Sequence, residues 1–67
     1  MIDLIVRDQG TIVLLEPASD LGRDWLAEHV EAESWQWLGE GVAVEPRFVT
    51  DIVNGANLDG LDIRVSG

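Results

Sequence analysis

Cysteine and lysine are both absent from this chain of 67 residues. Without cysteine there is no disulfide framework and no thiolate chemistry, which fits a reducing compartment. The longest apolar runs, "IVLL" and "VAV", are far shorter than the roughly 20 residues of a membrane-spanning helix. The first residues, "MIDLIVRD", lack the basic region and long apolar stretch of a signal peptide. We therefore expect a soluble protein of the cytoplasm.

Basic residues are scarce as well. Four arginines face thirteen acidic residues, and the formal net charge at pH 7 is −9. Nucleic acid and anionic membranes repel such a charge, so direct binding to either is not expected. The charge suits a basic partner, but it also suits a protein that merely stays soluble. Composition leaves both interpretations open.

The short length limits the number of domains and the depth of any site. Residues 1–67 are predicted to form one domain, and a chain of this size buries only about 60% of the surface that its unfolded form exposes. Little room remains for a deep active-site cleft beside a core. With 46% hydrophobic residues, the chain nevertheless has enough apolar side chains to fold.

Hydrophobic patterns and turn residues predict the secondary structure. Ser19 is a suitable N-cap, Pro46 suits the first position of a helix, and Gly60 suits the residue after a helix end. The predicted elements are strands near 2–8 and 11–16, a helix at 20–31, a hairpin at 35–45, a helix from 46 to the stop at "NLDG", and a strand in "LDIRV".

The predicted order is ββαββαβ, and each helix has one apolar face. This favours a two-layer α+β fold, with both helices on one face of a mostly antiparallel sheet. The residues predicted on the apolar faces are Leu21, Trp25, Leu26, His29 and Val30 in the first helix, and Phe48, Val49, Ile52, Val53 and Ala56 in the second.

Acidic residues gather on the polar face of the first predicted helix. Asp20, Asp24 and Glu28 follow one another four residues apart, about 6 Å along a helix axis, and Glu31 joins them. Like charges at this spacing destabilise an isolated helix. Arg23 is the nearest base, three residues from Asp20. Such a row could replace phosphates at a Lys/Arg-rich surface, or it could be an ordinary solvated face.

Two further acids could extend this field. Glu33 and Glu40 would support it if they lie on the same side as the helix. The predicted partner-binding residues are therefore Asp20, Asp24, Glu28, Glu31, Glu33 and Glu40.

Catalytic and metal-binding patterns are poorly supported. The sole histidine, His29, falls on the apolar side of the first helix, where a structural role is favoured. Asn57, Asp59 and Asp62 could supply oxygen ligands for calcium, but they lack the series of an EF-hand loop, and a helix stop explains them better. We predict no enzyme activity, cofactor or metal.

Three tryptophans are many for this length. Trp35 and Trp37 lie two residues apart, so in a strand they would point to the same side. They suit a core under the helices, or an exposed patch for a protein partner. A regulatory interaction module, or a homodimer formed through these two residues, is therefore an alternative function, although the sequence favours a monomer.

The segments "GTIVLLEP", "GRDWLAEHV" and "VAVEPRFVTDIVNGANLDGL" resemble a family of short acidic proteins from phages and mobile elements of proteobacteria. The resemblance covers nearly all of residues 4–61 and extends to anti-CRISPR inhibitors of type I systems. It implies a non-enzymatic inhibitor in the cytoplasm of a bacterial host. Such an inhibitor would mimic DNA and block the basic surface where a Cascade complex takes hold of its target. The resemblance assigns only the acids of the first helix to the site and makes "EPRF" a strand-to-helix junction.

Overall fold

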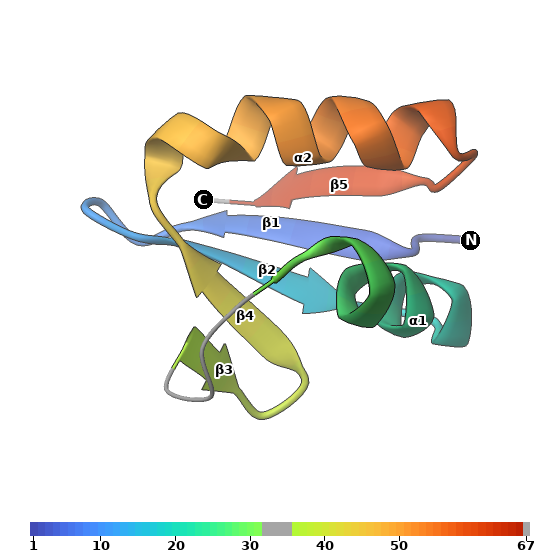
Figure 1. Cartoon of the computed structure of the whole chain (residues 1–67), viewed down its shortest axis with the longest axis horizontal. Helices are drawn as coiled ribbons and strands as arrows, with labels where there is room; N and C mark the ends of the chain where they lie inside the picture. Colours follow the sequence, from blue (N-terminus) through green and yellow to red (C-terminus); the bar gives the residue numbers. More distant parts are fainter. Residues whose placement is uncertain (32–35, 67) are drawn as a thin grey trace.

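Two helices cover one face of a five-stranded sheet in the computed structural model, which describes residues 1–31 and 36–66 (Figure 1). The predicted α+β class and the ββαββαβ order are confirmed. The elements are β1 (Leu4–Asp8), β2 (Val13–Pro17), α1 (Asp20–His29), β3 (Trp37–Leu38), β4 (Gly41–Val44), α2 (Pro46–Leu58) and β5 (Ile63–Ser66). Within the described ranges, no helix is both long enough and apolar enough to cross a membrane.

The strands lie in the order β3-β4-β2-β1-β5. The pairs β1–β2, β2–β4 and β3–β4 are antiparallel, and β1–β5 is parallel, so the predicted mostly antiparallel sheet is confirmed. A parallel neighbour requires a crossover, and α2 supplies it between β4 and β5. The two edges of the sheet are β3 and β5.

The core lies between the sheet and both helices. Register places Val6 opposite Leu15, and Leu15 opposite Val42, so these side chains share one face of the sheet. Trp25 and Leu26 of α1 pack onto this face, as does Ala56 of α2. The buried cluster consists of Leu4, Val6, Val13, Leu15, Trp25, Leu26, Val42, Val44, Ala56 and Leu61.

Turn and cap residues act where the sequence predicts them. Ser19 caps α1, with its Oγ accepting the Gly22 N–H at 3.0 Å, and Pro46 is the first residue of α2. Gly60 has φ of 87°, and the Leu61 N–H bonds back to the Ala56 carbonyl at 3.0 Å. This 6→1 bond closes the end of α2 in the way expected of a glycine that follows a helix.

The first helix is shorter than predicted. It ends at His29, and Val30 is its extended C-cap, with φ of −109° and ψ of 111°. Val30 packs half-buried against the core, which requires the chain to leave the helix there. The negative C-terminal end of a helix also disfavours further acids. Glu31 therefore lies beyond the helix rather than in its row.

Two hydrophobic residues predicted on the apolar faces are exposed. Leu21 is 54% exposed and Phe48 is 47% exposed. At about 100° per residue, each lies roughly 90° away from the middle of the buried stripe of its helix. The buried stripes are narrower than the predicted apolar faces, because a small sheet covers little of each helix.

The strand limits differ from the predicted ones by a few residues. β1 begins at Leu4. β2 begins at Val13, because the turn that contains Gly10, with φ of 93°, extends to Ile12, whose carbonyl accepts the Gln9 N–H at 2.8 Å. The second hairpin is confirmed from Trp37 to Val44, whereas its predicted start at Trp35 lies outside the described residues.

Candidate partner-binding surface

The exposed face of α1 carries unbalanced negative charge. Asp20, Asp24 and Glu28 are all exposed, one helical turn apart. Within the described chain, neither Asp24 nor Glu28 has an ion-pair partner. Leu21, which lies three residues before Asp24 on the same side, adds an exposed apolar group beside the row.

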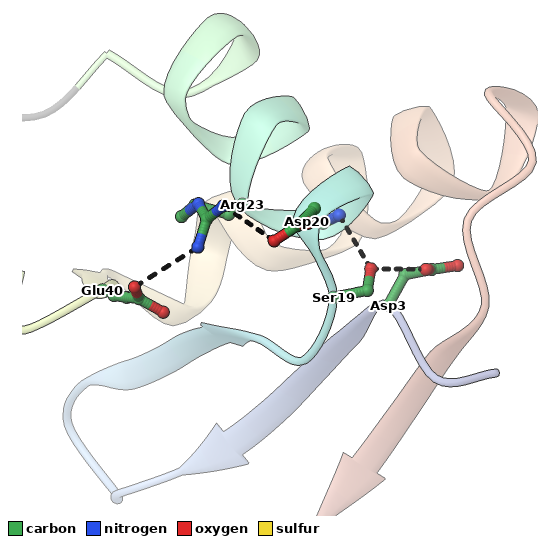
Figure 2. Close-up of polar contacts among 6 residues, drawn as sticks. Asp3, Ser19, Asp20, Arg23 and Glu40 are labelled. Atoms are coloured by element: carbon green, nitrogen blue, oxygen red, sulfur yellow. Dashed lines mark hydrogen bonds and ion pairs between the residues drawn. The ribbon is translucent and has the colours of Figure 1, made fainter.

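Arg23 joins the row to the turn of the second hairpin (Figure 2). Its guanidinium contacts the Asp20 carboxylate at 2.7 Å and the Glu40 carboxylate at 3.5 Å. Glu40 therefore lies beside α1, although it is distant in sequence. Asp20, Asp24, Glu28 and Glu40 form what we call the acidic surface, on which Arg23 is the one base among the described residues.

The N-terminal end of α1 is fastened to the start of β1 (Figure 2). The Ser19 hydroxyl donates to Asp3 Oδ1 at 2.6 Å while accepting the Gly22 N–H, and Asp3 Oδ2 accepts the Asp62 N–H at 2.8 Å. The Asp62 N–H and the Ser19 hydroxyl stabilise the Asp3 carboxylate and hold its pKa below the usual 3.8. One carboxylate thus links β1, α1 and the start of β5.

Gly22 allows α1 to approach the sheet at this end. It is buried, and a Cβ built on it would overlap the carbonyl oxygen of Asp3. No side chain larger than hydrogen fits there without moving the helix away from β1. The close approach therefore sets the distance between the sheet and α1, which carries three residues of the acidic surface.

The C-terminal end of α1 is fastened to the end of α2. The Trp25 indole Nε1–H donates to Asp59 Oδ2 at 2.7 Å. His29 stacks on Trp25 with ring centroids 4.5 Å apart, and its Nδ1 lies 3.0 Å from the Trp25 carbonyl oxygen. Its Nε2 lies 3.7 Å from Asp59 Oδ2. The structural role favoured for His29 agrees with these contacts, although its side chain is 44% exposed rather than buried.

The structure does not gather all six predicted acids. Asp20, Asp24, Glu28 and Glu40 belong to the acidic surface, whereas Glu33 lies outside the described residues. Glu31 lies instead at a separate cleft of about 430 Å³ between the end of α1 and the start of α2. Further acids of that cleft are Glu45 and Asp51.

Two of the three residues considered as calcium ligands make other contacts. Asp59 accepts from Trp25, and Asp62 Oδ2 lies 3.9 Å from the N-terminal amine. Within residues 1–31 and 36–66, no three histidine, cysteine or acidic side chains are grouped so that they could hold a metal ion. The turn after α2 is explained by Gly60 instead.

The alternative surface rests on Trp35 and Trp37. Trp37 is half-buried and packs against the core, as the core interpretation expects. Trp35 lies outside the described residues, so the homodimer through both side chains stays a prediction.

Sequence reasoning missed the residues that position the surface. Asp3 and Asp59 look like two of many acids, and their partners lie 16 and 34 residues away in the chain. An available signal was the glycine in "DLGRDW", since a glycine inside a helix often marks close packing.

Comparison with known proteins adds no relative. No family model matches this chain, and no curated protein or solved structure matches it. The resemblance to anti-CRISPR proteins therefore stays a prediction.

Proposed function

We propose that this protein is a non-enzymatic inhibitor that occupies a Lys/Arg-rich DNA-binding surface. Its acidic surface takes the place of DNA phosphates. The resemblance of its sequence makes a subunit of a type I CRISPR effector the proposed target, in the cytoplasm of a bacterial host. Target DNA is then excluded by charge and by volume, with no chemical step.

The observation that carries this proposal is the imbalance of charge on the acidic surface. The acidic surface carries four exposed carboxylates and one guanidinium, and Arg23 is already shared between Asp20 and Glu40. Ordinary exposed helices pair acids with bases four residues away. Among the described residues, Asp24 and Glu28 are paired with no base, so both carboxylates are available to a partner. Their repulsion of each other is relieved only when external cations approach.

The anchoring of α1 supports the same proposal. A binding surface needs fixed spacing between its charges, so that a partner meets them without ordering them first. Polar contacts hold both ends of α1, through Ser19–Asp3 and Trp25–Asp59. Charge complementarity of this kind raises association rates and makes them sensitive to salt.

The test measures binding to purified type I Cascade at low and high salt, with target DNA as competitor. The double variant Asp24→Lys with Glu28→Lys should weaken binding by roughly a hundredfold, as expected for the loss of several close charge pairs. The wild-type complex should also weaken as salt rises, and target DNA should displace it.

A matched control separates this surface from net charge. Asp8→Lys with Asp51→Lys makes the same change in charge at two exposed positions outside the acidic surface. It should retain most of the affinity. Equal losses in both variants, or wild-type binding that ignores salt and DNA, would contradict phosphate mimicry. Circular dichroism on each variant checks that the fold is intact.

A further inference from the structure

The free edge of β5 is the second surface of interest. β5 is an outer strand and pairs with β1 alone. Because the Leu4 N–H donates to the Asp62 carbonyl, the backbone groups of Asp62, Arg64 and Ser66 face β1. Those of Ile63 and Val65 therefore point away from the sheet. Unpaired N–H and C=O groups in a row are a template for another strand.

This edge is only lightly protected, because β5 has four residues and one charged side chain, Arg64. β5 contains no proline, and Val65 is 73% exposed. Beside it lies a groove of about 420 Å³ between α2 and the sheet, with walls that include Val6, Val13, Val49 and Val53. Asp8 is the one acid among its described lining residues. In a chain with net charge −9, this region combines Asp8 and Asp62 with Arg64, so a second copy is repelled less here than at the acidic surface.

We propose that β5 pairs antiparallel with β5 of a second copy of this chain. If Ile63 lies on the twofold axis, it pairs with Ile63 of the second copy. The N–H and C=O of Ile63, which point away from β1, then form two hydrogen bonds with the same groups of the second Ile63. Val65 then lies opposite Leu61 of the second copy. Arg64 lies opposite Asp62 of the second copy, on the other face of the sheet.

Charge complementarity selects this partner and this register. Within the described chain, Arg64 has no ion-pair partner. Asp62 is half exposed, and its contact with the N-terminal amine is long, at 3.9 Å. Shifting the register by two residues would set Arg64 opposite Arg64 of the second copy. Like charges directly opposite are unfavourable in a sheet.

The α2 helices enlarge the interface. Gly55 faces Trp25 of α1, and the other side of α2, with Thr50 and Val53, lines the groove that Val65 of β5 also lines. Stable interfaces bury about 1,200 Å² or more, which a short strand pair does not provide alone. In the dimer the two α2 helices lie on the same face of a continuous sheet. Their neighbouring sides carry Thr50 and Asn54, which line the groove, and Arg47, whose charge is paired with Glu45.

This dimer is independent of the proposed function. α1 and the β3–β4 hairpin lie on the side of the molecule opposite α2 and β5 (Figure 1). Pairing through β5 would therefore leave both acidic surfaces exposed, at opposite ends of the dimer.

Sedimentation equilibrium over a wide range of protein concentration tests the proposal. The wild type should show a reversible monomer–dimer equilibrium. Arg64→Asp should raise the dissociation constant roughly tenfold, because two like-charge pairs replace two attractive ones. Val65→Lys, at an exposed position, should also weaken the dimer. The double variant Asp62→Arg with Arg64→Asp restores opposite charges and should recover most of the wild-type affinity.

Arg23→Asp is the control, since it changes net charge equally on the other side of the molecule. A monomer at every attainable concentration would overturn the proposal. So would a dimer that tolerates both Arg64→Asp and Val65→Lys, or loss of dimer equally in Arg23→Asp. If the wild type is a monomer that binds another protein, and Val65→Lys abolishes that binding, then β5 pairs with a strand of that protein instead.

Discussion

The two helices are held to the same sheet in different ways. α1 carries like charges along its exposed face, and side-chain hydrogen bonds fasten both its ends to other elements. α2 has no side-chain N-cap hydrogen bond and begins with Pro46, while its one base, Arg47, is paired with Glu45 at 3.0 Å. Polar contacts therefore appear where charge repulsion opposes the helix. The difference teaches that the N-terminal end of α1 is held by side-chain contacts that the start of α2 lacks, and this fits the role proposed for the acidic surface.

The largest expected effect concerns the glycines of the two helices. Gly22→Ala should lower the free energy of unfolding by about 2–4 kcal/mol, because the new Cβ overlaps the Asp3 carbonyl oxygen and α1 must move. Gly55→Ala is the matched variant in α2. Its Cβ would lie 3.6 Å from the Trp25 ring, an ordinary contact, so it should stabilise by up to about 1 kcal/mol.

Urea unfolding of both variants measures this contrast. Equal effects of the two substitutions would show that α1 does not depend on its close approach to β1. A stabilising Gly22→Ala would contradict the described packing outright.

The next effect concerns the caps. Ser19→Ala removes the acceptor of the Gly22 N–H and the donor to Asp3, and should cost about 1–2 kcal/mol. Glu45→Ala at the N-cap of α2 removes only an exposed ion pair with Arg47 and should cost about 0–1 kcal/mol. Thermal and urea unfolding compare the two. If Glu45→Ala costs as much as Ser19→Ala, the helices are not anchored differently.

The anchor of α1 should also depend on pH. The pKa of Asp3 is lowered in the folded protein by the Asp62 N–H and the Ser19 hydroxyl, so the folded state holds this proton less tightly than the unfolded state. This contribution is fully present above the usual 3.8 and is lost as pH falls through the lowered folded value. Asp3→Asn should therefore flatten the loss of stability with acid. Unfolding curves between neutral pH and about pH 2 measure the slope, and an unchanged slope would contradict the role of Asp3.

Local signals in the sequence were enough for most of the fold. Ser19, Pro46 and Gly60 mark helix ends by backbone geometry that depends on a few neighbouring residues, so they could be predicted. The parallel pairing of β1 with β5 joins segments about sixty positions apart, and no local pattern encodes it.

The same contrast between local and long-range signals applies to the candidate site. The row Asp20–Asp24–Glu28 follows from helical spacing alone, whereas Glu31 does not join it because Val30 leaves the helix to pack on the core. The position of Glu40 beside α1 depends on how the second hairpin packs, which tertiary structure decides.

The smallest expected change in stability discriminates best between a binding surface and a solvated face. Glu28→Gln removes repulsion with Asp24 and an acid near the negative end of α1. It should therefore stabilise the fold by about 0.3–0.5 kcal/mol, measured by urea unfolding. A solvated face predicts this gain and nothing else, so partner binding would be unchanged. A phosphate mimic predicts the gain together with weaker binding to Cascade at low salt, while Asp51→Asn leaves binding as it was. Opposite signs for stability and affinity at one residue cannot arise from loss of folding, because the variant is more stable than the wild type.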